Sequence, residues 1–107
     1  MKVLLDVCTP VQMRNALPGH EVHTAMKIGW GELENGELLG ASESAAFHLL
    51  IICDKNLRHQ QNLVQSRRLA ILELWINHRP TLEKHFPLIT QTAEAMRPGE
   101  HRSISAP

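Results

Sequence analysis

Two short apolar runs, each closed by an aspartate, constrain the fold of this chain more than any other feature. Val3-Leu4-Leu5 ends at Asp6, and the run from Leu49 to Cys53 ends at Asp54. Both runs lead into turn or capping residues, and segments with helical spacing separate them. This pattern is typical of parallel strands that are connected by helices. The sequence therefore predicts an α/β fold in which a carboxylate follows each of two strands.

The same reasoning assigns elements along the rest of the chain. Strands are expected at residues 2–6, 21–24, 49–53 and 69–75, with a final edge strand at 101–105. Helices are expected after the Thr9-Pro10 cap, from an Asn35 cap, over 58–66, and over 81–96 with a break at Pro87. A chain of 107 residues fits a single domain, expected over 1–105 with a short tail at 106–107.

Composition narrows the classes of partner. Lys plus Arg and Asp plus Glu number 11 each, so net charge provides no general attraction to nucleic acid, and a local patch would have to hold one. No apolar run approaches the roughly 20 residues that span a bilayer, and no signal peptide is visible. The only cysteines, Cys8 and Cys53, lack metal-site spacing, which favours reduced thiols in a cytoplasmic protein.

The two aspartates are the first candidates for a functional site. Ligands of open α/β sheets bind outside the carboxyl ends of the strands, at the point where the strand order reverses. A 2-1-3-4 order would make the strands before Asp6 and Asp54 neighbours, about 4.8 Å apart. Hard cations such as Mg²⁺ and Mn²⁺ prefer carboxylate oxygens and need few protein ligands. Glu37, in the first turn of a predicted helix, is a third candidate.

Each of these acids also has a structural explanation. An aspartate at the end of a strand often caps the next helix, as Asp6 would. Asp54 would form an Asx turn, and Glu37 would be favoured by the helix dipole. Zinc and cysteine chemistry are disfavoured, because the seven histidines show no zinc-site spacing and neither thiol has a recognisable base beside it.

Several short motifs occur in order along the chain and carry a resemblance to a known family. They are Leu4-Leu5-Asp6, Leu17-Pro18-Gly19-His20-Glu21-Val22, Gly29-Trp30, Asn35-Gly36-Glu37-Leu38-Leu39, Asp54-Lys55-Asn56-Leu57, Gln60-Gln61-Asn62-Leu63 and Arg97-Pro98-Gly99-Glu100. Together they resemble the PIN-like domain family related to VapC toxins and the Mut7-C domain. The resemblance covers nearly the whole chain. It implies a three-layer α/β/α sandwich with a mostly parallel central sheet of four to five strands.

The resemblance also implies a function. PIN-like domains bind Mg²⁺ or Mn²⁺ through clustered acids and cut RNA, and many are toxins that a small antitoxin protein neutralises. Asp6, Glu37 and Asp54 match the acidic positions, so they are the predicted catalytic and metal-binding residues. Val7 stands where members of the family commonly carry a second acid. This departure favours an alternative, a catalytically silent module that binds a partner protein or RNA without cleavage.

Polar and basic residues beyond Asp54 are the predicted RNA contacts, with a solvated surface as their plain alternative. They are Asn56, Arg58, Gln60, Gln61, Asn62 and Arg68. Homodimers are common among PIN-like proteins, and the helix over 81–96 would serve either an interface or the core. A phosphoacceptor domain of the response-regulator type is disfavoured, because the chain lacks paired acids after the first strand and an evident late-strand lysine.

Overall fold

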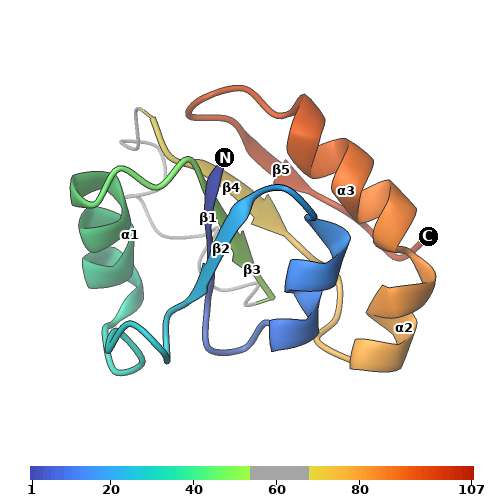
Figure 1. The fold of residues 1–107 in the computed structure, drawn as a ribbon, viewed down its shortest axis with the longest axis horizontal. Helices are drawn as coiled ribbons and strands as arrows, with labels where there is room; N and C mark the ends of the chain where they lie inside the picture. The colour runs from blue at the N-terminus through green and yellow to red at the C-terminus, as the bar shows by residue number, and fades with distance from the viewer. Residues whose placement is uncertain (54–67) are drawn as a thin grey trace.

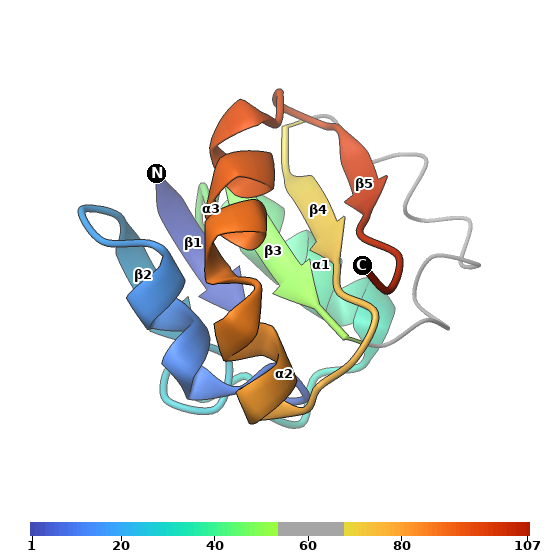
Figure 2. The same ribbon diagram turned by 90° about the vertical axis from the view of Figure 1, so that its right-hand side faces the viewer.

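The computed structural model describes residues 1–53 and 68–107. Within these residues, five parallel strands form one sheet in the order β2-β1-β3-β4-β5 (Figure 2). The strands are β1 (Lys2–Leu5), β2 (Glu21–Thr24), β3 (Leu49–Ile52), β4 (Ala70–Glu73) and β5 (His101–Ser103). The predicted α/β class is therefore confirmed. The sheet has the 2-1-3-4 order that makes β1 and β3 neighbours, and β5 extends it at the edge beyond β4.

Helices cover both faces of the sheet. Figure 1 shows α1 (Asn35–Ser44) on one face and, on the other, the 3₁₀ helix η1 (Val11–Ala16), α2 (Arg79–Lys84) and α3 (Phe86–Ala95). In the described part of the chain, no helix is long and apolar enough to span a bilayer. The predicted helix over 58–66 lies outside the described residues, and the narrower PIN-like architecture stays a prediction.

The alternation of β3 explains why both faces are covered. Leu49 and Ile51 join the apolar cluster under η1, α2 and α3, whereas Leu50 and Ile52 join the cluster under α1. All four side chains are buried, as the uninterrupted apolar run predicts for a central parallel strand. Each such side chain contributes roughly 1.5–3 kcal/mol of transfer free energy. β3 therefore contributes side chains to both halves of the core.

The starts of two helices differ from the prediction. Thr9 does not cap a helix, because η1 begins after Pro10 and has no side-chain cap hydrogen bond. The Thr9 hydroxyl bonds to the Asp6 carboxylate instead. For α1 the N-cap is Glu34 rather than Asn35, and Glu34 forms a capping box with Glu37 three residues later.

The helix predicted over 81–96 is divided at His85. α2 begins at Arg79 and ends at Lys84, and α3 begins at Phe86. Pro87 lies in the first turn of α3, where its missing N–H breaks no intrahelical bond. The break predicted from Pro87 is confirmed, and it falls just before the proline because that residue favours a helix start.

Candidate functional site

Buried acids lie at the carboxyl edge of the sheet, the edge formed by the ends of β1, β3 and β4. Asp6 follows β1 and is 8% exposed, and Glu73 ends β4 and is 3% exposed. The register pairs Leu5 with Ile51 and Ile52 with Glu73, so Asp6 and Glu73 lie at nearly the same level, on either side of β3. At about 4.8 Å per strand, their backbones are separated by roughly 10 Å.

Asp6 stands where the order of the strands reverses. From β1 the chain proceeds to β2 on one side and returns to β3 on the other, so the reversal lies between β1 and β3 (Figure 2). The Asp6 N–H donates to the carbonyl of Ile51 at 3.2 Å, which ties the end of β1 to β3. Sheets of this class bind their ligands at that place.

The loop after β1 fixes the Asp6 side chain. The Thr9 hydroxyl lies 2.6 Å from Oδ1 of Asp6 and 3.1 Å from the carbonyl oxygen of Ile51, and it donates to them. A buried carboxylate requires such a donor, since it has lost its hydration. Thr9 therefore holds one oxygen of Asp6 in a defined direction. The structural explanation predicted for Asp6, a cap on the next helix, is wrong, because η1 has no side-chain cap hydrogen bond and Asp6 accepts from Thr9 instead.

Glu37 also has a structural partner. Its Oε1 accepts the backbone N–H of Glu34 at 3.1 Å, which completes the capping box of α1, and its side chain is exposed. The first turn of α1 lies toward the same end of the molecule as the carboxyl ends of the strands (Figure 1). Among the described residues, however, no group of three His, Cys, Asp or Glu side chains is placed to hold a metal.

The remaining predicted residues divide into two groups. Asp54 and the predicted RNA contacts Asn56, Arg58, Gln60, Gln61 and Asn62 lie outside the described residues. Arg68 is described, and it precedes β4. Because the strands are parallel and β4 spans four residues, or about 13 Å, Arg68 lies at the opposite edge of the sheet from Asp6. The structure does not bring those two residues together.

Glu73 is a carboxylate that the sequence analysis did not single out. Its Oε1 accepts a hydrogen bond of 2.7 Å from the hydroxyl of Ser103, its register partner on β5. The signal was available, because a single acid interrupts the apolar run from Leu69 to Leu74. Burial of a charge in a strand is costly without a partner, so such an acid indicates a polar site.

The environment of the Cys53 thiol, at this edge, disfavours its ionised form. Burial raises the pKa of the Cys53 thiol to about 11, and its Sγ lies 3.3 Å from the carbonyl oxygen of Ile76. The reactive form of cysteine is the thiolate, which a raised pKa disfavours near neutral pH. Cys8 is exposed on the loop after β1.

Comparison with known proteins adds no family assignment. No protein-family model matches this chain, and no curated protein and no solved structure matches it. The residues at the carboxyl edge and the sequence motifs are therefore the basis for assigning a function.

Proposed function

We propose that this protein is a metal-dependent ribonuclease of the PIN-like type, with its site at the carboxyl edge, and that it is the toxin component of a toxin–antitoxin pair. The observation that supports the site most is the position of Asp6. It is a buried carboxylate at the reversal of strand order, beside β3, and Asp54 follows β3 two residues after its last residue, Ile52. We propose the RNA substrate, the small antitoxin partner and the homodimer from the family resemblance alone.

The described residues supply one suitable ligand for a hard divalent cation. Asp6 offers carboxylate oxygen, the preferred ligand of Mg²⁺ and Mn²⁺, and Mg²⁺ commonly takes only one or two carboxylates and keeps several waters. Within the described residues, no group of three His, Cys, Asp or Glu side chains could hold a metal ion. The proposal therefore requires Asp54 as a ligand beside Asp6. Glu37 would act through a water, because its Oε1 already serves the helix cap.

The residues of the chain have separate tasks in this proposal. Bound Mg²⁺ or Mn²⁺ would neutralise charge on the scissile phosphate and make water a better nucleophile. Thr9 keeps the Asp6 carboxylate in a fixed orientation through its 2.6 Å hydrogen bond. Arg58 and the amides after Asp54 would hold the RNA backbone. Arg68, at the opposite edge, would contact only RNA that extends far from the cleavage point.

One observation favours the silent module as a second candidate. Val7, directly after Asp6, is 52% exposed and places an apolar side chain where PIN-like proteins commonly carry an acid. Loss of that carboxylate would remove a ligand or a group that orients water. In this case the protein would bind a partner protein, or bind RNA without cleaving it.

Cleavage of a labelled RNA of mixed sequence tests the proposal. The reaction is run with Mn²⁺ or Mg²⁺, with EDTA, and with the Asp6→Asn and Glu94→Gln variants. Glu94 is the matched control, since it is a half-exposed acid on α3 that pairs with His20. We expect cutting by the wild type and by Glu94→Gln, and none with EDTA or Asp6→Asn. Folded, antitoxin-free protein that does not cut would support the silent module.

A further inference from the structure

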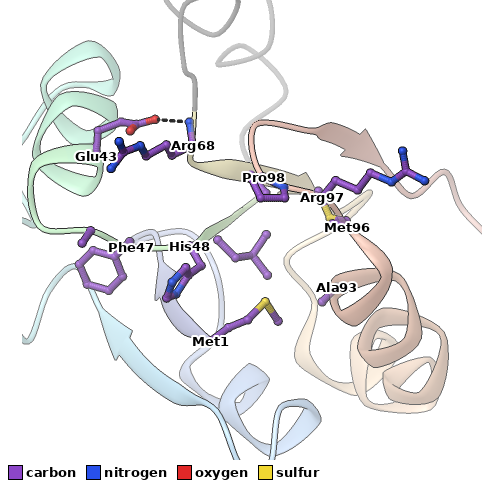
Figure 3. A pocket seen from close by; sticks show the side chains of 12 residues that line it. Met1, Glu43, Phe47, His48, Arg68, Ala93, Met96, Arg97 and Pro98 are labelled. Atoms are coloured by element: carbon purple, nitrogen blue, oxygen red, sulfur yellow. Dashed lines mark hydrogen bonds between the residues drawn. The ribbon is translucent and has the colours of Figure 1, made fainter.

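A mainly apolar hollow lies at the amino edge of the sheet, where β3 and β4 begin. It is a pocket of about 460 Å³ (Figure 3). Its apolar wall includes Phe47, Leu49, Ala70, Ala93 and Met96. Pockets of roughly 300–1,000 Å³ with mostly apolar walls are the usual size for small-molecule sites. The amino edge therefore has room for a ligand, well away from Asp6.

Small side chains explain why the pocket exists. Ala70, at the start of β4, and Ala93, on α3, both line it and are almost fully buried. Alanine at both positions leaves space that a leucine would fill. Met1 and Met96 also border the pocket, and their flexible side chains adapt to different ligand shapes.

Two arginines and one acid are the charged residues that line this pocket. Arg68 and Arg97 line it, and Figure 3 shows that the Arg97 side chain extends away from it. Lys2 is not part of the lining, but its ammonium lies behind the wall, 4.5 Å from the centre of the Phe47 ring, and donates to the carbonyl of Ala45 at 2.7 Å. Glu43 is the acid in the lining, and its Oε1 already accepts the backbone N–H groups of Arg68 and Leu69, at 3.1 and 2.9 Å. The local excess of cations contrasts with the zero net charge of the chain.

His48 adds a directed donor. Its Nδ1 accepts the backbone N–H of Lys2 at 2.8 Å, so in the neutral ring Nε2 carries the hydrogen. The residue is exposed and belongs to the lining of the pocket. A ligand that places an anionic acceptor at the mouth would meet this N–H and the charge of Arg68, while its apolar part contacts Leu49 and Ala93.

We propose that the amino-edge pocket binds a small apolar carboxylate, of the size of a medium-chain fatty acid. The hydrocarbon part occupies the space between β4 and α3, and the carboxylate lies at the cationic mouth. This site is independent of the proposed ribonuclease. Ligand binding, not RNA cleavage, tests this site. A failure of either proposal therefore leaves the other intact.

Titration with decanoate, followed by amide chemical shifts in NMR spectra, tests the proposal. We expect saturable shifts at Phe47, Leu49, Ala70 and Ala93, and none at Thr9 on the carboxyl edge. Decanol, which has the same chain and no charge, should bind about tenfold more weakly. An absence of saturable shifts at the pocket, or equal affinity for decanol and decanoate, would overturn the proposal.

Two variants locate the ligand and its charge. Ala93→Leu should fill the pocket and weaken decanoate binding at least tenfold, with folding checked by circular dichroism. Arg68→Gln leaves the core untouched and should weaken decanoate binding about tenfold without changing decanol binding. Arg79→Gln, an exposed arginine paired with Glu83 on α2, is the control and should bind as the wild type does. Undiminished decanoate binding by Arg68→Gln contradicts the proposal even if Ala93→Leu does not fold.

Discussion

The two edges of one sheet differ sharply in chemistry, although the strands between them are only three or four residues long. At the carboxyl edge, buried carboxylates are held by hydroxyl groups, Asp6 by Thr9 and Glu73 by Ser103. At the amino edge, an apolar pocket opens between alanines, with cations at its mouth. In a parallel sheet every residue that precedes a strand lies at one edge and every residue that follows one lies at the other. Position relative to the strand, rather than proximity in sequence, therefore decides which residues meet.

The largest effect should come from the core that both edges share. Leu50→Ala removes a fully buried side chain at the centre of β3, in the cluster under α1. Loss of the transfer free energy and the resulting cavity should lower the free energy of unfolding by about 2–5 kcal/mol. Urea denaturation measures this loss. A change below about 1 kcal/mol would mean that the α1 side of the sheet contributes little to stability.

Thr9→Val should destabilise the carboxyl edge selectively. Valine cannot donate to the buried Asp6 carboxylate, and a hydrogen bond to a charged group contributes about 1.5–3 kcal/mol. Thr92→Val is the matched control, because the Thr92 hydroxyl is exposed and bonds only within α3, to the carbonyl of Leu88. If both variants lose the same stability in urea, Thr9 has no special role in holding Asp6.

The stability of the protein should also fall as the pH rises through the range in which thiols ionise. The pKa of Cys53 is raised from 9.0 to about 11, first by burial. Between those values the unfolded chain loses the Cys53 proton and the folded protein keeps it, so ionisation favours the unfolded state. The chain has no tyrosine that would titrate in this range.

Urea midpoints at pH 8 and pH 10 measure this effect. Cys53→Ala should flatten the decline, and Cys8→Ala should not, because Cys8 is exposed. Equal declines in the two variants would show that Cys53 is not the group responsible.

The smallest effect separates the two roles of Glu37. Glu37→Gln keeps a capping box, in which glutamine can replace glutamate, so stability should change by less than about 0.5 kcal/mol. Glu37→Ala loses the cap and should cost about 0.5–1 kcal/mol. Cleavage by Glu37→Gln should decrease, and by less than in Asp6→Asn. Cleavage equal to that of the wild type would reduce Glu37 to a helix cap.

The sequence predicted the sheet well because its strands are short, apolar and separated by clear helical signals. The parallel direction followed from that alternation, whereas the 2-1-3-4 order entered only as the arrangement that would make Asp6 and Asp54 neighbours. Glu73 was overlooked although it interrupts an apolar run, because the strand expected over 69–75 placed it inside the strand, whereas β4 ends at Glu73 and the register sets it level with Asp6. Arg68 was grouped with Asp54 by proximity in sequence, but a chain that enters a parallel strand must first return to the amino edge.

The helix starts show the same dependence on tertiary contacts. Thr9-Pro10 has the sequence of a helix cap, yet the Thr9 hydroxyl donates to the Asp6 carboxylate, because that buried group needs a hydrogen-bond donor. Asn35 was the expected cap for α1, but the reciprocal bonds between Glu34 and Glu37 begin that helix one residue earlier in the chain. Local propensity predicted that a helix would start in each region. Competition between neighbouring side chains decided which residue would cap it, or whether any would.

Binding of Mn²⁺, mapped by paramagnetic broadening of amide signals, tests the difference between the two edges most directly. The broadening falls steeply with distance from the ion, so it identifies the nearest residues without assuming an activity. We predict selective loss of the amide signals of Asp6, Val7 and Thr9, retention of those of Ala70 and Ala93, and no selective loss in Asp6→Asn. Broadening centred on the amino edge, or unchanged by Asp6→Asn, would contradict the assignment of the metal site to the carboxyl edge.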